Sequence, residues 1–223
     1  MTTTPASRSS RTARVRRDDF THGPLDWRPW LDPPAEATLT ARQRHSLLQP
    51  SRAHDPHYRL LAEDPDLLEA RTRTEFDIFH STRDGLPRGE RELAATIVAR
   101  VDGGVYAASE HARFAAHHSH RRGEVHKLLE EGPGALIADA AVRPLWAALT
   151  AAVAALATTP VSLDADHLAA LHAAGLDDLD ILDAIAAGAW VAWADRAVLT
   201  LGEPVAGTQE RRRPVDPPPR IDP

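Results

Sequence analysis

The chain has no cysteine among its 223 residues. This absence excludes disulfide bonds, thiolate metal sites and catalysis by a thiol nucleophile. The chain also has a single methionine, Met1, and a single lysine, Lys127, so nearly all of its positive charge comes from arginine. A formal net charge of -6 does not favour nucleic-acid binding, which usually requires a basic surface.

Long apolar runs are missing as well. No stretch of 18 uncharged apolar residues occurs, and the best candidate, 145–158, is too short to span a membrane and predicts a buried core helix. Arginines near the N-terminus are not followed by an apolar stretch, so this segment is not typical of a secretory signal. We interpret this segment as a disordered basic tail or as a transit peptide. We expect a cytoplasmic protein with no membrane partner.

The composition favours helix over strand. The chain is 43% hydrophobic, its second half is rich in alanine, and β-branched residues are sparse. No segment alternates apolar and polar residues as a strand would. We therefore predict an all-α domain of about six to eight helices at 19–204. Disordered tails are expected at 1–18, which is basic, and at 205–223, which is rich in proline and arginine.

An N-terminal arm at 19–37 should precede the helices. Its tryptophans, Trp27 and Trp30, are expected to cover apolar surface on the body or on a neighbouring subunit. Helix starts are indicated by capping residues such as Asp64, which is followed by proline. The last long helix follows a cluster of aspartates and ends at Gly202, and its predicted core face is Ile181, Ile185, Trp190, Trp193 and Ala197.

The core motif, 88–120, carries most of the functional information. Glu92 lies on one predicted helix, Gly103-Gly104 break that helix, and His111 lies on the next. Residues 107 and 111 are one helical turn apart and share a face. A carboxylate and an imidazole on two helices joined by a tight turn form the skeleton of a proton relay.

Several segments together resemble one superfamily. They are 65–70 (PDLLEA), 91–93 (REL), the glycine turn, 109–113 (SEHAR), 176–184, 193–196 (WADR) and 201–202. On these residues the chain is similar to the carboxymuconolactone decarboxylase/AhpD-like (alkylhydroperoxidase D) superfamily. It most resembles the longer bacterial alkylhydroperoxidase-domain, peroxidase-related proteins, from about residue 19 to residue 204.

The resemblance implies an antioxidant site that this chain does not complete. In the peroxidases of the superfamily, a Cys-x-x-Cys pair reduces peroxide while a glutamate and a histidine relay protons. Glu92 and His111 fall on the relay positions, whereas Gly104 and Ala107 fall on the cysteine positions. Because peroxide reduction by this route needs two thiols, we expect thiol peroxidase activity to be lost. The resemblance also implies a homo-oligomer, either a trimer, a hexamer or a dimer.

Two interpretations of Glu92 and His111 stay open. They are an acid–base pair of a cysteine-independent enzyme of the decarboxylase type, acting on a lactone or keto acid, or a buried hydrogen-bonded pair in a non-catalytic oligomeric scaffold that binds a partner. Tyr106 is a weaker catalytic candidate and a stronger packing residue. Besides a lactone or a keto acid, the third small-molecule ligand that we consider is a peroxide.

No metal or cofactor is predicted. The cluster of His117, His118 and His120, with His126 nearby, lacks a carboxylate at ligand spacing and lies beside Arg121 and Arg122. The sequence therefore favours a solvated helix end over a metal site. Ser109 has none of the flanking glycines of a serine hydrolase.

Overall fold

The computed structural model describes residues 15–16, 19–81 and 84–207, and most of both predicted tails lies outside these ranges. In chain order its elements are β1 (Leu25–Pro29), η1 (Glu36–Thr38), α1 (Ala41–Ser46), η2 (Pro50–His54), α2 (Pro56–Leu61), α3 (Pro65–His80), α4 (Arg88–Asp102), α5 (Val105–Ser119), α6 (Arg122–Glu131), α7 (Pro133–Ile137), α8 (Pro144–Leu156), α9 (Ala165–Ala173), α10 (Asp178–Leu201) and β2 (Gly202–Ala206).

The all-α prediction is confirmed. Seven of the ten α-helices in the described ranges have nine residues or more, and the other three are single-turn or two-turn helices. The predicted starts are also observed, because the side chains of Asp64, Asp164 and Asp177 each accept a backbone N–H of the first turn of α3, α9 and α10.

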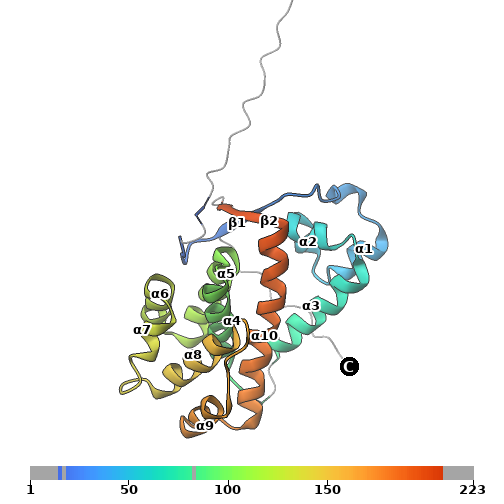
Figure 1. Cartoon of the computed structure of the whole chain (residues 1–223). Helices are drawn as coiled ribbons and strands as arrows, with labels where there is room; N and C mark the ends of the chain where they lie inside the picture. The colour runs from blue at the N-terminus through green and yellow to red at the C-terminus, as the bar shows by residue number, and fades with distance from the viewer. Residues whose placement is uncertain (1–14, 17–18, 82–83, 208–223) are drawn as a thin grey trace, which may run out of the picture.

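The centre of the molecule is built by α4, α5, α8 and α10 (Figure 1). The buried stripe of α4 includes Leu93 and Ile97, which are both fully buried. Gly188 lets α10 come close to its neighbours, since a Cβ atom there would meet Leu156 at 2.9 Å and Val98 at 3.3 Å. This packing holds α10 beside the α4–α5 hairpin, where the predicted relay lies.

The expectation that the chain has no strands was wrong. β1 and β2 pair antiparallel from Leu25 opposite Ala206 to Pro29 opposite Gly202. Each strand has only five residues, and proline occurs in both. Leu25 to Arg28 of β1 alternate apolar and polar residues, a signal that was missed because the run is so short, whereas β2 shows no alternation. The pairing also places Val205 and Ala206 in the fold, although the C-terminal tail was predicted to begin at residue 205.

The N-terminal arm lies on the body of the same chain. Trp27 is 3% exposed, and its indole Nε1 donates to the Val198 carbonyl oxygen of α10 at 3.2 Å. The Ser109 hydroxyl of α5 donates to the Gly23 carbonyl oxygen at 2.5 Å. Trp30, by contrast, is 53% exposed. The arm therefore covers apolar surface of its own subunit through Trp27.

The predicted core face of α10 was wrong in part. Ile181 is buried, but Trp193 is 50% exposed, and the buried positions further along are filled by small residues and by Asp195. Alanine and glycine occupy the core face because α10 approaches α4 and α8 closely. Residue size misled the prediction, since the large aromatic side chains were assigned to the interior.

Helix α10 is the one described helix whose length and composition would allow it to cross a membrane. Within the fold it packs against α3, α4, α8 and α9 as a core helix does.

Candidate functional site

The α4–α5 turn fixes the geometry of the predicted relay. Gly103 caps α4 in the left-handed region at φ 80°, where a residue without a side chain is favoured, and α5 begins directly after Gly104. This sharp reversal lays α5 antiparallel to α4. Glu92 of α4 and His111 of α5 consequently face each other across the hairpin.

Glu92 and His111 form a direct pair. The distance from Glu92 Oε2 to His111 Nδ1 is 2.8 Å, and Arg88 Nε donates to the other carboxylate oxygen at 3.2 Å. The Glu92 side chain is 2% exposed and that of His111 is 17% exposed. The carboxylate therefore orients the imidazole through Nδ1 and leaves Nε2 as the ring nitrogen available for proton exchange.

Aromatic rings hold the imidazole in place. The His111 ring lies 5.1 Å from that of Phe79 and 6.5 Å from that of Trp190, measured between centroids. Arg71 in turn stacks on the Trp190 ring, with its guanidinium carbon 4.7 Å from the ring centroid. These contacts restrict rotation of the His111 side chain.

A charged cluster on α3 borders this aromatic group. Glu75 forms ion pairs of 2.9 Å with Arg52 and with Arg71. Burial alone raises the pKa of Glu75, but the two guanidinium groups outweigh it and lower that pKa. Glu75 thus remains a carboxylate near His111.

A carboxyl group fills the space beside Gly104, the residue that the resemblance placed on the first cysteine position. A Cβ atom built on Gly104 would overlap the Asp195 carboxyl group of α10, far inside the 3.0 Å that real Cβ atoms keep. Asp195 therefore occupies the space that a side chain at residue 104 would need. Ala107, on the second cysteine position, is partly buried against the core.

Asp195 is buried without a hydrogen-bond partner. It is 1% exposed, and neither carboxyl oxygen has a partner among the described residues. Burial, together with the neighbouring Asp102 carboxyl group, raises the pKa of Asp195 to about 7, although His111 and Arg196 act in the opposite direction. Asp195 can therefore take up and release a proton near neutral pH.

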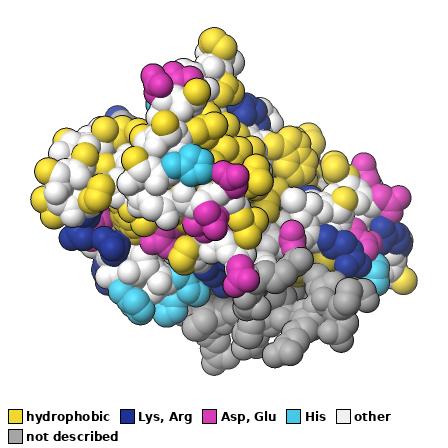
Figure 2. Space-filling view, turned by 90° about the horizontal axis from the view of Figure 1, so that it is seen from below, with side chains coloured by type: hydrophobic (Ala, Val, Ile, Leu, Met, Phe, Trp, Pro, Cys, Tyr) yellow, Lys and Arg dark blue, Asp and Glu magenta, His cyan; other side chains and the backbone are white. Residues whose placement is uncertain are grey.

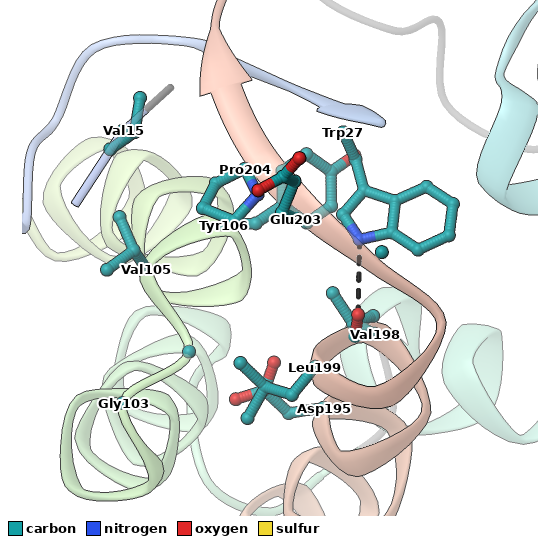
Figure 3. A pocket seen from close by; sticks show the side chains of 12 residues that line it. Val15, Trp27, Gly103, Val105, Tyr106, Asp195, Val198, Leu199, Glu203 and Pro204 are labelled. Atoms are coloured by element: carbon teal, nitrogen blue, oxygen red, sulfur yellow. Dashed lines mark hydrogen bonds between the residues drawn. The ribbon is translucent and has the colours of Figure 1, made fainter. Parts of the chain in front are cut away.

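A small cavity opens beside this carboxyl group (Figure 3). Its volume is about 20 Å³, which is room for one water molecule, since a water needs roughly 10–15 Å³. In Figure 3 the Asp195 side chain projects from α10 toward the α4–α5 turn. The lining residues are Val15, Trp27, Gly103, Gly104, Val105, Tyr106, Asp195, Val198, Leu199, Gly202, Glu203 and Pro204.

The structure thus brings together some of the predicted residues and separates others. Gly104 and Tyr106 line the cavity with Asp195, whereas Glu92 and His111 form their pair outside its lining. The histidine cluster lies at the far end of α5, where the rings of His117 and His118 are 4.9 Å apart. In the described part of the chain, no group of three or more histidine, aspartate or glutamate side chains could hold a metal ion.

Asp195 was not identified from the sequence as a site residue. The available signal was a single acidic residue in the alanine-rich, apolar second half of α10, at a position that the helical period places on the buried side. A carboxylate on such a face is a candidate for function, because burying it unpaired is costly.

Three solved structures share this architecture. A peroxidase-related protein from Ralstonia eutropha JMP134, described as an alkylhydroperoxidase AhpD core, superposes with a TM-score of 0.64 at 18% identity and covers 78% of this chain and 90% of its own. A peroxidase-related protein from Silicibacter sp. TM1040 gives a TM-score of 0.65 at 17% identity, with coverages of 80% and 92%. The chain has the AhpD-like fold.

The third structure is more distant. The debrominase Bmp8 superposes with a TM-score of 0.54 at 17% identity and covers 87% of this chain and 91% of its own. No protein-family model and no curated protein matches the sequence. At these identities the comparisons establish the AhpD-like fold, and the chemistry has to be argued from the residues of this chain.

Proposed function

We propose that this chain is a cysteine-independent acid–base catalyst built on the AhpD-like fold, and that it does not reduce peroxides through thiols. The supporting observation is the buried, unpartnered carboxyl group of Asp195 in the space above Gly104, beside the Glu92–His111 pair. A scaffold that had merely lost two cysteines would be expected to fill that space with an apolar contact. We also propose that the protein acts in the cytoplasm.

A lactone or a keto acid is the ligand class that we propose, in preference to a peroxide. The debrominase supports the idea that this fold can hold a small ligand without a full complement of thiols. It has been solved as a cysteine-to-alanine variant in complex with 2,3,4-tribromopyrrole. Catalysis here would use proton transfer, with Glu92 orienting His111 and His111 exchanging the proton.

Peroxide turnover tests the first half of this proposal. The purified protein, checked to be free of haem and metal, is mixed with cumene hydroperoxide and dithiothreitol. We expect no loss of hydroperoxide above the rate in buffer, since the chain supplies no thiol. Rapid destruction of the hydroperoxide would contradict the proposal.

Replacement of His111 by glutamine tests the second half. A panel of small lactones and keto acids is screened by proton NMR for conversion by the wild-type protein. For any compound that is converted, His111→Gln should lower kcat by about 100-fold or more, because general acid–base catalysis contributes factors of that order. Turnover that survives this change would show that the relay has no catalytic role.

A non-catalytic oligomeric scaffold is the second candidate, and the outer face of α10 favours it. From Leu179 to Trp193, the exposed positions of α10 are Leu179, Leu182, Ala186, Ala189 and Trp193, all apolar. A solvent-facing helix surface normally carries charges. Figure 2, which views the molecule from below Figure 1, shows hydrophobic side chains spread over a broad area of the surface.

We propose that a second copy of the chain covers this face, which we call the α10 stripe. A continuous apolar stripe on one helix can pair with itself across a twofold axis. Light scattering after gel filtration should give the mass of a homo-oligomer, and Trp193→Glu should reduce it to that of a monomer. Val142→Glu is the matched control, because Val142 is 79% exposed and lies off α10. A monomeric wild-type protein, or an oligomer that persists in Trp193→Glu, would contradict this assignment.

A further inference from the structure

Asp195 has the features of a reacting group and not of a structural one. A carboxyl group that holds elements together has donors on its oxygens, as Asp183 does where it accepts the Leu86 N–H at 3.0 Å. Asp195 has none among the described residues, although it is 1% exposed. Its free oxygens border a cavity, so a molecule placed there could supply the missing donor or the proton.

The cavity disfavours an anion. Within the described ranges, the charged side chains that line it are Asp195 and Glu203, and both are acidic. Glu203 is paired with Arg28, and the Asp102 carboxyl group also acts on Asp195 electrostatically. A substrate with a carboxylate of its own would meet like charge at short range, whereas a neutral molecule would not.

The start of α5 supplies the complementary group. Gly104 is the N-cap of this 15-residue helix, and no side chain caps it. The Val105 N–H already donates to the Gly103 carbonyl oxygen at 3.1 Å, so the contribution of this end is the helix dipole, which makes it positive. A developing negative charge on an oxygen beside Gly104 would therefore be stabilised while Asp195 takes up a proton nearby.

We propose that Asp195 is the catalytic base of this site and that its substrate is a small neutral carbonyl compound with an acidic C–H bond. This assignment rests on the acid–base function proposed above. Of the two ligand classes proposed there, it retains lactones and other neutral carbonyl compounds and disfavours ionised keto acids. The ionised Asp195 carboxylate removes a proton from the carbon next to the carbonyl. The C–H electron pair forms the C=C bond of an enolate, and the carbonyl oxygen becomes the enolate oxygen at the start of α5.

The reaction consumes no net proton, because Asp195 gives back the proton that it removes. Neutral Asp195 returns its proton to carbon, which regenerates the carboxylate and requires no oxidant, reductant or metal. Once the proton on Asp195 has exchanged with solvent, its return to the same carbon replaces the hydrogen of the substrate by one from solvent. The cavity has room for about one water, so its lining has to open further to admit the substrate.

Methyl pyruvate and pyruvate form a matched pair of probes, since both have the same enolisable methyl group and only pyruvate carries a charge. Each is incubated in D₂O with the full-length protein, and loss of the methyl proton signal is followed by NMR. We expect the protein to accelerate the exchange of methyl pyruvate, relative to its rate in buffer, at least tenfold more than it accelerates that of pyruvate. The rate should rise as the pH passes through about 7, where Asp195 ionises. Asp195→Asn should lower it by about 100-fold or more.

Asp178→Asn is the control for a change of charge on the same helix, because this side chain is 91% exposed. It should exchange at the wild-type rate. Thermal unfolding of each variant establishes that it is folded before its rate is compared.

The outcomes separate the two proposals. If Asp195→Asn keeps the wild-type rate and His111→Gln loses it, the relay stands and the role of Asp195 is overturned. If the reverse holds, Asp195 is the base and the His111 relay is overturned. Equal exchange of pyruvate would overturn the charge selection, and no exchange of methyl pyruvate by the wild-type protein would overturn the proposed substrate class.

Discussion

Gly104→Ala should destabilise the protein by about 3 kcal/mol, near the upper end of the usual cost of overpacking a core. The backbone at Gly104, with φ -82° and ψ 75°, is not in the left-handed region, so it does not itself demand glycine. The expected cost arises because the new methyl group would overlap the Asp195 carboxyl group. Chemical denaturation of the two proteins measures the difference.

The same substitution made in an Asp195→Ala protein identifies the cause of the destabilisation. In an Asp195→Ala protein the obstructing carboxyl group is gone, and the same change at residue 104 should cost less than about 1 kcal/mol. The difference between the two costs is the coupling energy of the pair. Equal costs in both backgrounds would mean that the carboxyl group does not occupy this space.

Gly123→Ala is the matched control. Gly123 lies in α6, and a Cβ atom there would have no atom within 4 Å. Alanine in an open helical position is neutral or stabilising, by roughly 0.4–1 kcal/mol. A loss of stability at Gly123 similar to that at Gly104 would indicate a general intolerance of alanine, independent of Asp195.

The wild-type protein should lose stability relative to Asp195→Asn as the pH rises. The pKa of Asp195 is raised from 3.8 to about 7 in the folded protein, so the proton is bound more tightly in the folded than in the unfolded state. Folding is thus favoured while Asp195 is protonated, and this advantage is lost between pH 3.8 and about 7. Between pH 4.5 and pH 8, the stability difference should shift by about 3 kcal/mol in favour of the asparagine variant.

The groups around Asp195 set the size of this shift. Asp102 of α4 and burial raise the pKa, whereas His111 of α5 and Arg196 of α10 lower it. Glu203 of β2 lies across the cavity. Urea unfolding of both proteins at several pH values tests the expectation, with Asp178→Asn as the exposed control. A stability difference that does not change with pH would contradict the raised pKa.

The fold could be predicted because its signals are local. Asp64, Asp164 and Asp177 act as helix caps within three residues of their partners, and Gly103 ends α4 by its own conformation. The β1–β2 pair could not be predicted, since its two strands come from opposite ends of the domain, the alternation in β1 covers only four residues, and β2 has none. Their pairing depends on tertiary packing that no short segment reveals.

The site residues also divide into a pair that could be predicted from local sequence and one residue that could not. Glu92 and His111 belong to one helical hairpin, and their spacing around a glycine turn was enough to predict that they face each other. Asp195 reaches the same turn from α10, far along the chain, and its role depends on how α10 packs against α4. The resemblance placed Gly104 on a cysteine position, but it gave no indication that the Asp195 carboxyl group fills the space beside that residue.

Direct titration of the Asp195 carboxyl carbon by ¹³C NMR, with Asp195→Asn to assign the signal, tests the central claim most directly. We expect a midpoint at about pH 7. In His111→Gln the midpoint should be higher, because the positive charge that His111 can carry lowers the pKa of Asp195. A midpoint near the ordinary value of 3.8 would contradict an unpartnered, proton-exchanging carboxyl group in the place of the missing thiol.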